Sequence, residues 1–180
     1  SAYLRAHYPA EFLAAVISNQ GGYYSAFAYL SEGRRMGLTM LPPDINASDW
    51  AYRGCGTTIR VGLMHLKALR EDFVQQMVAE RQAHGPYRSL QHFLDRLQPE
   101  TAQTTLLIKA GCFDSVAGEL TRPALIWRLF ADQSGKPVGY LPIPTEYSTQ
   151  QKLAHEFELF GFPLSGHPLD LFTEVPAGLS

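Results

Sequence analysis

The sequence predicts a mostly α-helical fold that contains one small β hairpin. Apolar side chains recur at helical spacing in several separate segments, and 12 prolines and 15 glycines divide these segments into short elements. One stretch, residues 50–62, favours two short strands around a glycine-rich turn. With 180 residues, of which 46% are hydrophobic, the chain is long enough for one ordinary domain or two small ones.

The first part of the chain predicts two helices and the hairpin. Pro9 fits the first turn of a helix that Gly21-Gly22 ends, and a second helix covers about 23–36. Short polar side chains at 46–49 predict a turn, since each can bond to nearby backbone. The hairpin has its strands at 50–53 and 58–62 and its loop at 54–56.

The second part predicts further helices. An apolar stripe marks a helix that Gly85-Pro86 ends, and its members are Phe73, Val74, Met77 and Val78. Ser89 caps the next helix, which Pro99 breaks. The remaining helices are expected at 101–110, 123–131 and 148–160, with a linker rich in glycine and proline between the last two.

Charge is low overall but uneven along the chain. The formal net charge is −2 and the pI is about 6.3, which gives no general indication of a nucleic-acid partner. Residues 51–110 carry eight Lys or Arg and five Asp or Glu, whereas residues 111–180 carry four and eight. Any contact with DNA must therefore come from local clusters in the middle of the chain.

Cysteine content and hydropathy bear on where the protein resides. Cys55 and Cys112 are too far apart to act as a metal-binding pair, so we expect two reduced thiols in a cytoplasmic protein. No apolar run approaches the roughly 20 residues that a membrane span needs. The chain begins at Ser1 without an initiator methionine, so we expect a piece of a longer protein.

Six strings, in order and at similar spacings, resemble the bacterial C-family DNA polymerases, the DNA polymerase III α subunits. They are Tyr8-Pro9-Ala10-Glu11-Phe12, the pair Arg34-Arg35-Met36-Gly37 and Leu41-Pro42-Pro43-Asp44-Ile45-Asn46, Ile59-Arg60-Val61-Gly62-Leu63, Gly85-Pro86-Tyr87-Arg88-Ser89-Leu90, Leu107-Ile108-Lys109-Ala110-Gly111-Cys112-Phe113-Asp114 and Leu164-Ser165-Gly166-His167-Pro168-Leu169. The strings 21–25 and 48–50 look more like the accessory or error-prone branch of that family.

The resemblance implies four parts. Residues 1–40 would end the fingers domain, 41–117 would form a small sheet and a tandem helix-hairpin-helix region, 118–147 a helix and linker, and 148–180 a C-terminal helix and tail. In the family, the helix-hairpin-helix region tracks the minor groove of the primer-template duplex. The implied partners are therefore duplex DNA and the rest of the polymerase chain, with the sliding clamp as a further candidate and no membrane.

The candidate DNA-binding residues are those beside the two hairpin turns. Tight turns and helix N-termini present N–H groups to phosphate, and nearby Lys or Arg side chains add charge without reading sequence. The candidates are Lys67, Arg70, Lys109, Ala110 and Gly111, with Arg60 on the adjoining strand. The alternative for each of these cations is a solvated surface charge.

The first hairpin departs from the family pattern. Lys67-Ala68-Leu69-Arg70 stands where the family has glycines on both sides of a hydrophobic residue, so a positive φ is costly and Arg70 must supply charge instead. The second hairpin keeps Lys109-Ala110-Gly111, so we expect its backbone to approach a phosphate.

Polymerase chemistry needs carboxylates that hold two metal ions, and in the family these lie in the palm, upstream of this region. Asp44, Asp49 and Asp114 form no close pair, and Asp44 and Asp114 lie in turns where local hydrogen bonds are expected. We therefore expect no catalytic residue, metal site or cofactor here, although the parent protein would be a DNA-directed DNA polymerase that uses Mg²⁺. His167 is expected to make a structural hydrogen bond.

A rival function is that of a protein-interaction module. In this alternative, the acidic end and the aromatic helices dock a replication partner, and the hairpins are degenerate. Residues 126–130 are the nearest match to a clamp-binding peptide, but the leading Gln is absent. We expect this segment to be an amphipathic helix that buries Trp127 and Phe130.

Overall fold

The computed structural model describes residues 2–19, 23–137 and 142–164. It is mostly helical with one small sheet, as the sequence predicts. The elements are α1 (Ala2–His7), α2 (Pro9–Asn19), α3 (Tyr23–Arg35), β1 (Thr39–Leu41), β2 (Arg53–Cys55), β3 (Thr58–Arg60), α4 (Glu71–His84), α5 (Leu90–Leu97), α6 (Thr101–Lys109), the 3₁₀ helix η1 (Asp114–Val116), α7 (Arg122–Ser134) and α8 (Thr149–Phe160). Gly21-Gly22 and the His167 turn lie outside the described residues.

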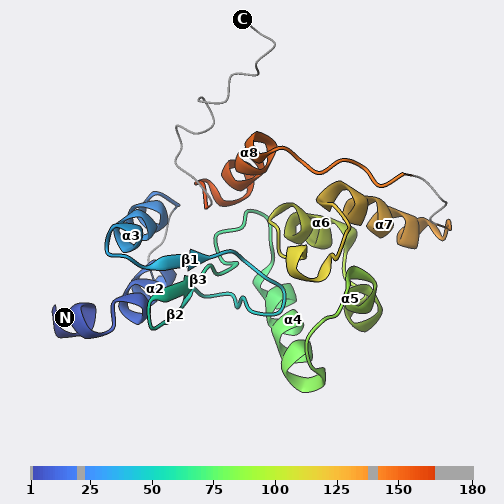
Figure 1. Cartoon of the computed structure of the whole chain (residues 1–180). Coiled ribbons are helices and arrows are strands. Elements are labelled where there is room, and N and C mark those ends of the chain that lie inside the picture. The colour runs from blue at the N-terminus through green and yellow to red at the C-terminus, as the bar shows by residue number, and fades with distance from the viewer. Residues whose placement is uncertain (1, 20–22, 138–141, 165–180) are drawn as a thin grey trace, which may run out of the picture.

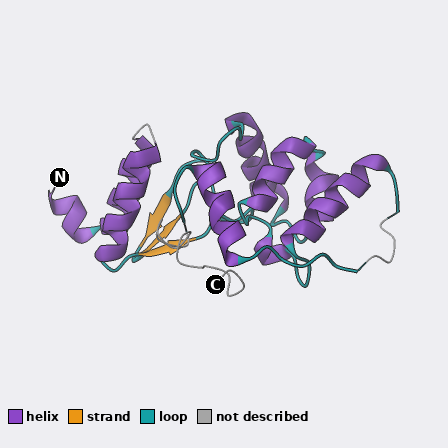
Figure 2. Cartoon of the chain, turned by 90° about the horizontal axis from the view of Figure 1, so that it is seen from above, coloured by secondary structure: helices purple, strands orange, loops and turns teal. Residues whose placement is uncertain are grey.

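The sheet separates two groups of helices. Helices α1–α3 lie on one side of it and α4–α7 on the other, which gives the chain an elongated shape (Figures 1 and 2). Helix α2 packs directly on β2, where a Cβ atom on Gly54 would lie 2.2 Å from the carbonyl carbon of Ala10. Only glycine permits this approach, so the contact fixes the sheet against the first helices.

The sheet differs from the predicted hairpin in two ways. The predicted strand at 50–53 is wrong, because the pairing runs through β2 and the tight turn lies at Gly56-Thr57, where Gly56 has a φ of +60°. A third strand, β1, pairs in parallel with β3, so the order is β1-β3-β2. The sequence does not reveal β1, because three residues before a proline pair show no alternation that marks a strand.

Most helix ends follow their local signals. The Ser89 side chain accepts a hydrogen bond from the N–H of His92 and caps α5, as predicted. Ser148 and Gln151 form a complete capping box at the start of α8. Helix α1, a six-residue element before Pro9, was not predicted, and Leu63, Leu66 and Leu69 are buried in turns that precede α4.

An aromatic cluster joins α4, α5 and the chain after α6. The ring of Phe93 stands edge-on to those of Tyr87 and Phe113, with centroid distances of 4.9 and 5.0 Å. Asn46 exchanges two hydrogen bonds with the backbone of Tyr87, and these tie the predicted turn at 46–49 to this cluster. The helices that carry the hairpins therefore share one core.

Helix α7 corrects an expectation about its aromatic residues. It buries Ala124, Leu125 and Leu129, whereas Trp127 and Phe130 are 50% and 53% exposed. The expected burial of both aromatic side chains is wrong, because α6 covers one face of α7 and the aromatic residues fall outside that face. Helix α8, by contrast, buries Leu159 and Phe160.

Candidate nucleic-acid interface

The first hairpin is a closed turn in spite of its missing glycines. Ala68 adopts a φ of +66°, the left-handed conformation that glycine accepts more readily. The buried side chain of Gln103, on α6, donates to the carbonyl of Ala68 and accepts from the N–H of Arg70, both at 2.9 Å. The N–H of Lys67 bonds to the carbonyl of Leu159. Tertiary contacts thus hold the turn in a conformation that alanine disfavours.

Helix α4 begins directly after this turn. Arg70 is its N-cap residue, but the Arg70 side chain does not cap the helix, and the first bond into the helix runs from Val74 N–H to Arg70 C=O. The N–H groups of Glu71 and Asp72 precede this bond and so have no partner within the helix. Together with the helix dipole, they present partial positive charge to the surface.

Acidic side chains surround the same turn. The Arg70 guanidinium bonds to Glu100 at 2.7 Å and to Asp72 at 3.1 Å. Hydrogen bonds with Asp72 and then with Glu100 raise the pKa of Arg70. A phosphate must therefore compete with two carboxylates for Arg70. The Lys67 side chain lies exposed beside the same turn.

The backbone of the second hairpin contacts other groups of the same chain. Gly111 has a φ of +88° and is buried, and a Cβ atom there would lie 2.5 Å from Nη2 of Arg122. The N–H groups of Ala110, Gly111 and Cys112 bond to the carbonyls that end α6, each at 3.0 Å. These backbone donors are already used within the chain, which leaves the half-buried Lys109 side chain as the candidate phosphate ligand at this hairpin.

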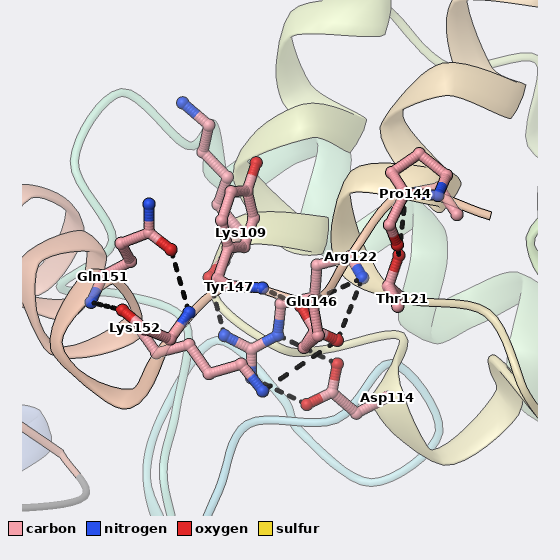
Figure 3. Close-up of polar contacts among 11 residues, drawn as sticks. Lys109, Asp114, Thr121, Arg122, Pro144, Glu146, Tyr147, Gln151 and Lys152 are labelled. Atoms are coloured by element: carbon pink, nitrogen blue, oxygen red, sulfur yellow. Dashed lines mark hydrogen bonds and ion pairs between the residues drawn. The ribbon is translucent and has the colours of Figure 1, made fainter. Parts of the chain in front are cut away.

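Arg122 organises the surroundings of the second hairpin (Figure 3). Its guanidinium makes a bidentate pair with Asp114, at 3.0 and 2.7 Å, and also donates to the carbonyl of Lys109. Its backbone N–H donates to Glu146. Burial opposes the charge of Arg122, but Asp114 and Glu146 outweigh it and raise the pKa of Arg122. The expected local bonds of Asp114 are thus replaced by a pair with Arg122.

The candidate residues occupy three places. The first hairpin is held by Gln103, in the first turn of α6, and the second hairpin follows the last turn of the same helix. At about 1.5 Å of rise per residue, Gln103 and the second hairpin are roughly 12 Å apart. Arg60 lies on β3, where its guanidinium donates to the carbonyl of Pro42 at 2.8 Å. Sequence reasoning missed Gln103, Arg122 and Glu146, because no local signal marks partners that are distant in sequence.

Comparisons with known proteins also identify a helix-hairpin-helix motif in this part of the chain. Residues 37–124 match a family model described as a helix-hairpin-helix motif. The chain is 33% identical to the DNA polymerase III subunit alpha of Treponema pallidum, over 97% of this chain and 17% of that protein. It is 32% identical to the Thermus aquaticus subunit, over 94% of this chain and 15% of that protein.

This chain is homologous to a segment of DNA polymerase III alpha subunits. An error-prone DNA polymerase of Mycolicibacterium paratuberculosis is also 34% identical, over 76% of this chain and 13% of that protein. The predicted resemblance to the polymerase III α family is confirmed, and both branches match. The error-prone assignment and the four predicted parts remain predictions. None of the helices in the described ranges is long and apolar enough to cross a membrane.

Proposed function

We propose that this chain is a non-catalytic, duplex-DNA-binding and structural segment of a DNA polymerase III alpha subunit that acts in bacterial replication. The observation that carries the proposal is the first hairpin, a closed turn that leads into the N-terminus of α4 within the helix-hairpin-helix motif. Lys67 and the first N–H groups of α4 lie at this turn. A phosphate of the duplex backbone fits this combination of charge and dipole.

Binding at this turn positions the duplex without reading its sequence. The proposed donors are the Lys67 ammonium group and backbone N–H groups, and neither distinguishes one base pair from another. Because Arg70 must exchange Asp72 and Glu100 for a phosphate, we expect weak binding by the isolated chain. Non-specific binding of this kind has dissociation constants of about 10⁻⁴–10⁻⁶ M at physiological salt.

The catalytic steps of the polymerase are proposed to take place elsewhere in the longer protein. In the part of the chain that the structure describes, no three His, Cys, Asp or Glu side chains form a possible metal-binding group. The described residues thus do not fit a site for Mg²⁺. The role left to this chain is to hold the duplex in place.

The acidic residues favour a second function. Glu71, Asp72 and Glu100 accompany Lys67 and Arg70 at the first hairpin, and this mixed surface also suits a protein partner with basic side chains. In that case the chain would dock a replication partner, and its hairpins would not bind DNA. Duplex affinity that is unchanged in a Lys67→Ala, Arg70→Ala double variant supports this function.

Equilibrium binding to a labelled primer-template duplex, measured at several salt concentrations, tests the proposal. Lys67→Ala is expected to weaken binding and to reduce the salt slope by about 0.9 for one lost phosphate contact. Arg88→Ala is the matched control, because it removes an exposed arginine just beyond the other end of α4, about 20 Å away. Binding that ignores salt, or equal effects of the two variants, contradicts the proposal.

A further inference from the structure

A groove on α7 lies apart from both hairpins. It has a volume of ≈ 420 Å³ and runs between α7 and residues 142–144. Trp127, Arg128, Lys136 and Ile143 are among its lining residues, and none of the candidate hairpin residues lines it. Its volume is within the range of about 300–1,000 Å³ that is typical of ligand sites.

The wall of this groove is fixed in place. The hydroxyl of Thr121 donates to the carbonyl of Pro144 at 2.7 Å, while also capping the N-terminus of α7. Two residues later, Glu146 accepts from the backbone N–H of Arg122. These hydrogen bonds attach residues 144–146 to the start of α7 and so hold this wall of the groove.

The lining combines an exposed aromatic ring with a surplus of positive charge. Trp127 is 50% exposed, and Ile143 across the groove is 55% exposed. Arg128 and Lys136 supply two positive charges, and neither forms an ion pair within the described ranges. The one acidic residue in the lining, Asp132, accepts a hydrogen bond from Gln91 at 3.2 Å.

We propose that this groove binds single-stranded DNA, with one base stacked on Trp127 and the neighbouring phosphates on Arg128 and Lys136. An exposed aromatic face beside cations is the arrangement that binds unpaired strands irrespective of sequence. Trp127 lies on α7 and Lys136 lies just beyond the C-terminus of that helix, and both line the groove, so a strand of several nucleotides can reach both. Paired bases cannot stack on Trp127, so this site is distinct from the proposed duplex contact and does not depend on it.

Tryptophan fluorescence tests the proposal, since the chain contains only two tryptophans. In a Trp50→Phe background, Trp127 alone reports, and we expect its emission to be quenched on titration with an oligothymidylate of about 12 nucleotides. In the unaltered chain, a labelled oligothymidylate is expected to bind about tenfold more weakly after Trp127→Ala, which matches the loss of one stacked base. Trp127→Phe is expected to retain most of the affinity.

Phe130→Ala is the matched control. Phe130 is an equally exposed aromatic residue of α7, at 53%, but it does not line the groove, so its loss is expected to leave strand binding unchanged. Unquenched Trp127 emission, or equal weakening by the Phe130 and Trp127 variants, overturns the proposal. Equal competition by a duplex or by polyglutamate also overturns it, the first in favour of plain charge attraction and the second in favour of an acidic peptide. A Lys67→Ala effect on duplex alone and a Trp127→Ala effect on single strands alone keep the two proposals separable.

Discussion

Two residues, Ala68 and Gly111, adopt left-handed backbone conformations at the two hairpins, although only one of them is glycine. At Ala68 the backbone conformation is unfavourable for a residue with a Cβ atom, and Gln103 maintains it with two hydrogen bonds. At Gly111 the absence of a side chain makes room for the Arg122 guanidinium. The first turn thus places Ala68 in a conformation that alanine disfavours. The second turn needs glycine at position 111, because Arg122 occupies the space that a Cβ atom would fill.

Ala68→Gly is expected to stabilise the chain. Removal of the Cβ atom relieves a left-handed conformation that costs roughly 1 kcal/mol or more, and the greater freedom of glycine in the unfolded chain offsets part of this gain. We expect a net gain of about 0.5 kcal/mol in the free energy of unfolding, measured by urea denaturation. Ala79→Gly, at an exposed position within α4, is the control and should lose about 1 kcal/mol. A loss of stability in Ala68→Gly would show that Ala68 is not strained.

Gly111→Ala is expected to destabilise the chain by more than Gly37→Ala. Both glycines have a φ near +87°, at 88° and 87°, so alanine is disfavoured at both by about 1 kcal/mol or more. Only at Gly111 does the new Cβ atom meet Arg122, whereas nothing lies within 4 Å of the one at Gly37. The guanidinium of Arg122 is paired with Asp114, so we expect its displacement to weaken this pair. If Gly111→Ala and Gly37→Ala lower the thermal stability by the same amount, the Arg122 side chain moves aside at no measurable cost.

At the scale of elements, α6 connects the two hairpins. Its first turn supplies Gln103 to the first hairpin, and the second hairpin follows its last turn. Glu100, the N-cap residue of α6, pairs with Arg70 across the same junction. Helix α6 therefore supports the first hairpin through Gln103, and its N-cap Glu100 would compete with the proposed phosphate for Arg70.

Glu100→Gln is expected to strengthen duplex binding. The change frees Arg70 from a pair at 2.7 Å and removes a negative charge next to the proposed phosphate contact. An exposed pair is worth up to about 1 kcal/mol, so we expect up to a fivefold gain in affinity at low salt. Glu119→Gln alters the net charge equally at an exposed position beyond the second hairpin, and should change affinity less. Equal gains would mean that only net charge matters, and no gain would favour the protein-interaction module.

At the scale of the whole chain, the proposed functions are binding functions. The chain spans 17% of the Treponema pallidum alpha subunit, and the described residues provide no metal-binding group. With Mg²⁺, nucleotides and a primer-template duplex, we expect no primer extension above a control without protein, measured on a denaturing gel. Extension by material free of host polymerase would contradict the non-catalytic assignment.

Helix positions and the family resemblance were determined by the sequence itself, because their signals are local. Ser89 and Ser148 lie three residues from the groups that they bond, so the composition of one turn is enough to place each helix start. The six strings that carry the family resemblance are likewise short and contiguous, and the Treponema pallidum relative is 33% identical over 97% of this chain.

Only the tertiary structure decided what each turn faces. Strand β1 forms because β3 pairs with it, Ala68 is held by a glutamine that lies 35 residues away, and Arg122 joins Asp114 to Glu146. The exposure of Trp127 depends on which face of α7 meets α6, and the pattern of apolar residues on α7 is too broad to select that face. These features arise from contacts between segments that are distant in sequence, so the pattern of residues within one segment does not predict them.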